Sequence, residues 1–131
     1  MELNLKDAVV IIIEKCGRYL FVKKAEDTPA GKYWAPVSGR VEDNETQEQA
    51  VTREAFEEIG IIVTPNKKEW ECKSEYGNYL LHWWSVNLVS GNEHPASKEI
   101  SEIKWVTLDE MQKLSPVFEK DIEYFSHKEL S

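Results

Sequence analysis

The segment GRVEDNETQEQAVTREAFEEIGI, residues 39–61, contains the strongest helix signal in the chain. Thr46 and Gln49 have the spacing of a capping box, in which each side chain accepts a hydrogen bond from the other residue's backbone N–H. Residues 47–59 contain neither Gly nor Pro, and Gly60 suits the left-handed conformation that ends many helices. The sequence therefore predicts a helix over Thr46–Ile59.

Three carboxylates share one side of this predicted helix. Glu54, Glu57 and Glu58 stand at positions i, i+3 and i+4, beside an apolar stripe that must face the core. The stripe consists of Val51, Ala55 and Ile59. Because like charges at this spacing repel each other, a cation should compensate them. Arg53 can reach Glu57, but one guanidinium cannot neutralise three carboxylates.

The carboxylates suit a hard divalent cation. Mg²⁺ or Mn²⁺ prefers oxygen ligands and is often completed by water and substrate phosphates, whereas Zn²⁺ would need Cys or His at suitable spacing. The two Cys and three His residues show no such spacing. The alternative is a solvated acidic helix face in an acidic protein, and the three Glu residues alone favour that alternative.

The whole segment resembles the Nudix box, G-x5-E-x7-R-E-U-x-E-E-x-G-U, where U is a bulky apolar residue. The matching positions are Gly39, Glu45, Arg53, Glu54, Glu57, Glu58, Gly60 and Ile61. Ala55 departs from the pattern because it is smaller than the usual Leu, Ile or Val. Upstream, Val37-Ser38-Gly39 stands where the family often has Pro-Gly-Gly.

The resemblance implies a Nudix-type α/β/α sandwich with a mixed central sheet and a catalytic loop and helix. It also implies metal-dependent hydrolysis of a nucleoside diphosphate linked to another moiety, with Mg²⁺ or Mn²⁺ as cofactor. A nucleoside triphosphate, cleaved to a monophosphate and pyrophosphate, is the leading substrate. ADP-ribose, nucleotide sugars, dinucleoside polyphosphates and capped RNA ends remain alternatives, as does a catalytically silent nucleotide-binding sensor. Dimers are common in the family, and the oligomeric state is open.

The resemblance also suggests a role for each acid of the helix. It makes Glu57 and Glu58 metal ligands, and Glu54 either the base or a further ligand that positions the attacking water. The backbone carbonyl of Ser38 would contact the metal. A further acid often comes from a loop nearer the C-terminus, and Glu99 is our choice there. Glu93 and Glu102 stay open.

The remaining box residues are expected to support the catalytic ones. Arg53 would belong to the catalytic machinery by orienting the row of acids. Glu45 would tie the loop to the start of the helix, while Gly39 and Gly60 would serve the backbone geometry of the motif. For Arg53 and Glu45 a purely structural role is the favoured interpretation.

The rest of the chain predicts a mixed α/β (α+β) fold. Ala8–Glu14 and Arg18–Lys23 predict a hairpin across a turn at residues 15–17, and residues 25–44 read mostly as a loop. Further strands are expected at Ile61–Thr64, Trp70–Tyr76, Tyr79–Val89 and Ile103–Val106. Thr107 and Glu110 repeat the capping box, and Ser115-Pro116 precedes a last helix. Phe118, Ile122 and Phe125 should share one face of that helix.

Aromatic side chains could stack on a nucleobase. The candidates are Tyr33, Trp34, Tyr79, Trp83 and Trp84. Alternation along the strand sends Trp83 and Trp84 to opposite faces, so one should be core and the other could line a pocket. The sequence assigns no substrate-binding residue among them.

Composition sets the outer limits. We expect one domain over residues 1–131, because independent cores need on the order of 100 residues. The formal charge of −8 opposes extensive contact with nucleic acid or anionic membranes. The chain has no long apolar run, its start does not resemble a secretory signal, and its two Cys are far apart. We therefore expect a cytoplasmic protein with reduced thiols.

Overall fold

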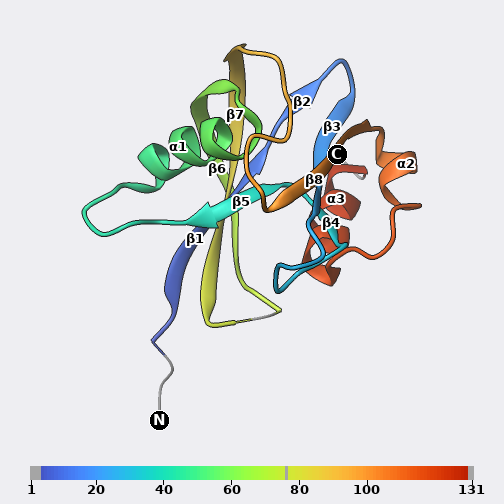
Figure 1. The fold of residues 1–131 in the computed structure, drawn as a ribbon. Coiled ribbons are helices and arrows are strands. Elements are labelled where there is room, and N and C mark those ends of the chain that lie inside the picture. The colour runs from blue at the N-terminus through green and yellow to red at the C-terminus, as the bar shows by residue number, and fades with distance from the viewer. Residues whose placement is uncertain (1–3, 76, 130–131) are drawn as a thin grey trace.

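A computed structural model describes residues 4–75 and 77–129 of the chain (Figure 1). The elements in order are β1 (Lys6–Ile12), β2 (Glu14–Lys15), β3 (Arg18–Lys24), β4 (Trp34–Ala35), β5 (Val37–Arg40), α1 (Gln47–Ile59), β6 (Ile62–Lys73), β7 (Tyr79–Ser90), β8 (Ile100–Val106), α2 (Leu108–Met111) and α3 (Glu119–Glu129). None of the helices that the structure describes is both long and apolar enough to cross a membrane.

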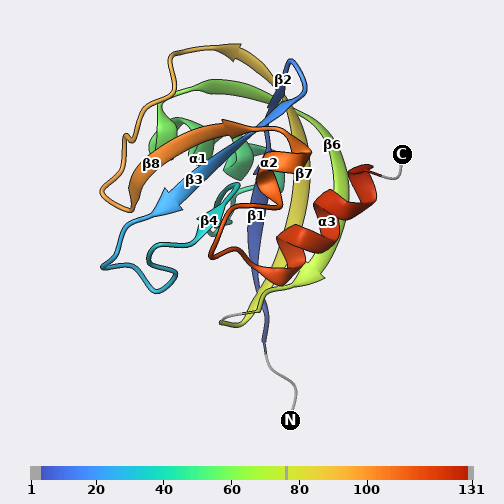
Figure 2. The same ribbon diagram turned by 90° about the vertical axis from the view of Figure 1, so that its right-hand side faces the viewer.

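The strands form two four-stranded sheets. The first has the order β5-β1-β7-β6, in which β1 and β7 run parallel and the other neighbours run antiparallel. The second has the order β2-β3-β4, and β8 pairs with β3. Figures 1 and 2 show α1 on one side of the sheets, with α2 and α3 on the other. The architecture is therefore the α+β class with a mixed sheet that the sequence predicts.

Alternation along β1 builds a core on each side. Val9 and Ile11 pack in the cluster that includes the apolar stripe of α1, whereas Val10 and Ile12 pack with residues of α2 and α3. Successive side chains of a strand point to opposite faces, so one buried strand supplies both cores. The site described below depends on this strand because β5, which precedes α1, pairs with it.

The first predicted hairpin is right in its turn and wrong in its pairing. Cys16 and Gly17 have φ angles of 52° and 77°, which suit the tight turn between β2 and β3. The strand expected over Ala8–Glu14 is divided, however, and its long part, β1, pairs with β5 and β7. The apolar run could not show which partner β1 would choose.

Three other boundaries also differ from the predictions. The expected loop over residues 25–44 contains the short strands β4 and β5, whose residues pair with β3 and β1. The two strands expected at 61–64 and 70–76 are one strand, β6, with irregularities in its register. Tyr76, its expected end, lies outside the described residues. Strand β8 begins at residue 100 rather than 103.

The C-terminal helices confirm one cap and correct one face. Thr107 and Glu110 form the predicted capping box of α2. In α3, Phe125 is buried as expected, but Ile122 is 45% exposed. Asp121 and Tyr124 are buried instead, because the inner face of α3 follows positions 121, 124 and 125. A carboxylate therefore lies on the side of the helix that faces the core.

Candidate active site

The helix α1 is built as its sequence predicts. Thr46 Oγ1 accepts a hydrogen bond from Gln49 N–H at 3.1 Å, and Gln49 Oε1 accepts one from Thr46 N–H at 2.9 Å. Gly60 ends the helix in the left-handed conformation. The apolar stripe of α1 is fully buried, which fixes the rotation of the helix about its axis. The neighbouring acids are thereby placed at the edge of the core.

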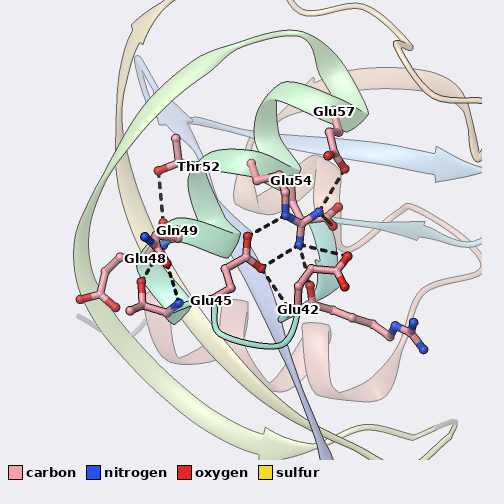
Figure 3. A network of polar contacts seen from close by, with 10 residues as sticks. Glu42, Glu45, Glu48, Gln49, Thr52, Glu54 and Glu57 are labelled. Atoms are coloured by element: carbon pink, nitrogen blue, oxygen red, sulfur yellow. Dashed lines mark hydrogen bonds and ion pairs between the residues drawn. The ribbon is translucent and has the colours of Figure 1, made fainter.

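Arg53 donates hydrogen bonds to three acids, Glu45, Glu54 and Glu57, which Figure 3 labels in the network of polar contacts around α1. Its Nε donates to Glu45 at 2.8 Å, and Nη1 donates to Glu54 at 2.6 Å and to Glu57 at 3.0 Å. Nη2 donates to Glu45 at 3.0 Å and to the backbone carbonyl of Arg40 at 2.8 Å. These bonds lower the pKa of the Glu45 carboxyl and raise that of Arg53. One guanidinium thus connects the loop after β5 to the acids of α1.

Glu54 is buried directly against Gly39. A Cβ atom at residue 39 would lie 2.0 Å from the Glu54 carboxyl carbon, so only glycine leaves room for this carboxyl. Burial raises the pKa of Glu54 to about 7, although the hydrogen bond from Arg53 acts in the opposite direction. The carboxyl can therefore change its protonation state near neutral pH.

Glu58 is the second buried acid of α1, and Glu57 is exposed. Glu58 Oε2 is buried without a hydrogen-bond partner in the part of the chain that the structure describes, and burial raises the pKa of the Glu58 carboxyl. The positive charge of Lys24 opposes this rise, while Glu99 and Glu57 add to it. The Glu57 side chain is 55% exposed. The three acids therefore share a side of the helix at different depths, which the spacing alone did not reveal.

The donor set fits a hard divalent cation. It consists of carboxylate oxygens, and Glu58 Oε2 has lone pairs that no protein group uses. Within residues 4–75 and 77–129, no three His, Cys, Asp or Glu side chains converge closely enough to form a complete metal centre. A cation here would need water or substrate oxygens to complete its coordination, as is usual for Mg²⁺.

A cavity of about 490 Å³ reaches Gly39, the residue that lies against the Glu54 carboxyl. Ser38, Gly39 and Arg40 of β5 line it, as does Glu99. Two other acids that the sequence left open lie elsewhere: Glu93 accepts a hydrogen bond from Trp105 Nε1 at 2.7 Å, and Glu102 pairs with Lys23 across β8 and β3. The structure therefore brings Ser38 and Glu99 to the same cavity as the box glycine.

The cavity is also lined by Asp121, a residue that the sequence did not single out. Asp121 of α3 is only 5% exposed, and its Oδ2 has no hydrogen-bond partner in either described stretch, residues 4–75 or 77–129. Burial raises the pKa of Asp121 to about 8, the charge of Glu75 adds to the rise, and Lys24 opposes it. The spacing of the residues was the signal available in the sequence. Asp121 stands three and four positions before Tyr124 and Phe125, which lie on the buried face of the helix.

Most of the candidate aromatics belong to the core. Trp83 is buried against Tyr124, and Trp84 lies on the opposite face, where its Nε1 donates to Gln47 at 2.9 Å. Trp34 is buried, and Tyr33 stacks on Phe118 at 4.6 Å. Among the described residues, the aromatic ones that line the cavity are Tyr79 and Phe118. Phe118 was expected only to pack one face of a helix.

Comparison with known proteins assigns the family. The profile of the NUDIX domain matches residues 4–127. CTP pyrophosphohydrolase of Escherichia coli is 29% identical over 100 residues, covering 72% of this chain and 74% of that protein. NAD-capped RNA hydrolase NudC of Deinococcus radiodurans is 29% identical over 82 residues, but these cover 63% of this chain and only 29% of that protein.

The fold comparison agrees. The crystal structure of MutT protein from Methanosarcina mazei Go1 superposes with a TM-score of 0.82 at 20% identity, covering 100% of this chain and 99% of that one. At this identity the match shows a common fold. Together with the domain profile, it establishes that this chain belongs to the NUDIX family and is a hydrolase of that family.

Proposed function

We propose that this chain hydrolyses a nucleoside triphosphate to a nucleoside monophosphate and pyrophosphate. The observation that carries the proposal is the cavity, whose lining includes Gly39, which lies against the Glu54 carboxyl, together with Glu99 and Asp121. Its volume of about 490 Å³ is within the range of small-molecule sites. The E. coli relative that this chain largely covers is named a CTP pyrophosphohydrolase.

The acids of α1 would hold the cofactor, Mg²⁺ or Mn²⁺. Glu57 and Glu58 are the proposed ligands, Glu54 is a further one, and the carbonyl of Ser38 and the carboxylate of Glu99 would complete the protein's share. When bound, the cation would neutralise charge on the pyrophosphate and lower the pKa of the attacking water. The buried, unpartnered Glu58 Oε2 supports this assignment.

Glu54 is the proposed proton acceptor. Burial raises its pKa to about 7 in the metal-free protein; a bound cation would lower this pKa, so proton transfer would also require the cation to lower the pKa of the attacking water. Water would attack one phosphorus, the P–O–P bridge would break, and Glu54 would take the proton that the water loses. Arg53 would act as a positioning residue, since its bond of 2.6 Å fixes the Glu54 carboxyl.

The nucleobase of the substrate would lie near Asp121 in the cavity. Tyr79 and Phe118 line the same cavity as Asp121 and offer aromatic surface, and Asp121 Oδ2 is buried without a hydrogen-bond partner among the described residues. The charge of Lys24 opposes the rise in the pKa of both Glu58 and Asp121, so it acts on both carboxyls. We place the phosphate chain of the substrate near Lys24, between Glu58 and Asp121.

A turnover screen tests the proposal. Nucleoside triphosphates should release a monophosphate and pyrophosphate with Mg²⁺, and Glu57→Gln or Glu58→Gln should abolish most of this release. Glu48→Gln is the matched control because Glu48 lies in the first turn of the same helix, away from the cluster. Full turnover in both Glu57→Gln and Glu58→Gln would refute the assigned roles.

A second candidate is hydrolysis of a capped RNA end. The relative named an NAD-capped RNA hydrolase favours it, although this chain covers only 29% of that protein. The charge of −8 opposes long RNA contacts. The same screen should therefore include capped RNA, ADP-ribose, nucleotide sugars and dinucleoside polyphosphates. Tight nucleotide binding without turnover across the panel would instead indicate a sensor.

A further inference from the structure

The segment after β7 is hydrogen-bonded to the C-terminal end of α1. We call residues 91–97 the clamp. His94 N–H donates to the carbonyl of Ile59 at 3.0 Å, and Ala96 N–H donates to the carbonyl of Glu58 at 2.9 Å. Carbonyls in the last turn of a helix lack partners within the helix. The clamp therefore supplies donors that the helix end requires.

Close packing reinforces these bonds. A Cβ atom at Gly60 would lie 2.3 Å from His94 Cε1, so the imidazole covers the bare helix end. A Cβ atom at Gly91 would lie 2.9 Å from the carbonyl oxygen of Gly60. Both glycines also have positive φ angles, 73° and 103°. The clamp thus contacts the end of α1 at a distance that side chains at these positions would prevent.

The same segment leads directly to Glu99. Glu99 N–H donates to Ser97 Oγ at 3.1 Å, and the Glu99 carbonyl accepts a hydrogen bond from Ala25 N–H at 2.8 Å. Its charge contributes to the raised pKa of Glu58, as expected for neighbouring acids. Ala96, which donates to the Glu58 carbonyl, therefore stands three positions before Glu99, and Ser97 between them accepts a hydrogen bond from the Glu99 N–H.

We propose that the clamp is a positioning element that sets the distance between the carboxylates of Glu58 and Glu99, and through it the affinity for the divalent cation. This inference rests on the proposed function, in which both acids are ligands. The two acids come from separate parts of the fold, the last turn of α1 and the connection between β7 and β8. Apart from the clamp, the backbone at Glu99 is held by the Ala25 bond and by the pairing of the next residue, Ile100, with Lys24.

Removing one hydrogen bond tests this role. Ala96→Pro deletes the N–H that reaches the Glu58 carbonyl, and Ala96→Ser keeps it. Mn²⁺ binding, followed by electron paramagnetic resonance without nucleotide, should weaken about fivefold in Ala96→Pro and stay unchanged in Ala96→Ser. The affinity for nucleotide measured without metal should not change. His94→Ala, which keeps the backbone bonds, should weaken Mn²⁺ binding in the same direction.

A double-mutant cycle separates positioning from general stability. If the clamp acts through Glu99, Ala96→Pro should cause no further loss of Mn²⁺ affinity in a Glu99→Gln background. An equal loss in both backgrounds, or unchanged binding in both Ala96→Pro and His94→Ala, would overturn the proposal. Failure of the wild-type chain to bind Mn²⁺ at all would instead overturn the proposed metal function, and the clamp proposal with it.

Discussion

Glu54 and Asp121 are buried acids with opposite surroundings. Glu54 belongs to α1 and receives a hydrogen bond from Arg53 at 2.6 Å, whereas Asp121 belongs to α3, on the other side of the sheets, and its Oδ2 has no partner. Burial raises both pKa values, to about 7 and about 8. A buried polar group without a partner lowers stability unless a ligand satisfies it. The comparison suggests that α1 is set up for chemistry and α3 for recognition.

The largest expected effect concerns the chemical step. Glu54→Gln keeps the shape of the side chain and removes its capacity to accept a proton. We expect turnover of a nucleoside triphosphate to fall by about 10²–10⁴. Steady-state release of monophosphate with saturating Mg²⁺ would measure this loss. Wild-type turnover in the variant would show that Glu54 is not the proton acceptor. The proposed chemical role of α1, in contrast to α3, would then be wrong.

The support behind Glu54 should matter nearly as much. In Gly39→Ala the new methyl group collides with the Glu54 carboxyl and must displace it. A misplacement of about 1 Å can reduce the rate about a hundredfold, which is the loss we expect in kcat. Ser38→Ala is the control, since it keeps the backbone carbonyl and should retain kcat. Equal activity in the two variants would show that the close contact does not position Glu54.

Asp121 should make the free energy of unfolding depend on pH. Its carboxyl has an ordinary pKa near 3.8 when unfolded and about 8 when folded, so the folded state binds the proton more tightly. The contribution of Asp121 to the free energy of unfolding should therefore be highest below pH 4 and fall as the pH rises to 8. Asp121→Asn should remove this slope and be more stable at pH 8.5, by on the order of 6 kcal/mol, because the folded and unfolded pKa values differ by about four and each pKa unit corresponds to roughly 1.4 kcal/mol.

Urea unfolding at pH 5, 7 and 8.5 would measure the difference between the two proteins. A constant difference across this range would show that Asp121 does not titrate as proposed. Comparing the same variant on CTP and UTP would then test recognition of the base, because Asn and Asp present different hydrogen-bonding groups. An unchanged preference between these nucleotides would place the base elsewhere.

The smallest expected effect concerns Arg53. Arg53→Lys keeps the charge but loses the two-pronged contact with Glu45 and the bonds that reach Glu54 and Glu57 together. We expect kcat to fall about tenfold, as for other residues that orient catalytic groups, while KM for the nucleotide stays the same. A change confined to KM would indicate instead that Arg53 contacts the substrate.

The same comparison shows what sequence could predict. The helix α1 and its acids were predictable because the capping box, the apolar stripe and Gly60 are local signals that agree. Asp121 was not, because its burial depends on the packing of α3 against the sheets. The pairing of β1 with β7 joins segments more than 70 residues apart, and no local pattern specifies it. The different depths of Glu57 and Glu58 likewise follow from tertiary packing.

The proposed mechanism requires the acids of α1 to bind the divalent cation that hydrolysis uses. Titration of Mn²⁺ into Glu58→Gln and into Glu48→Gln, two variants of one helix with the same change in charge, tests it most directly. We predict binding at least tenfold weaker in Glu58→Gln, with Glu48→Gln close to the wild type. Equal Mn²⁺ affinity in the two variants would show that Glu58 does not bind the cation.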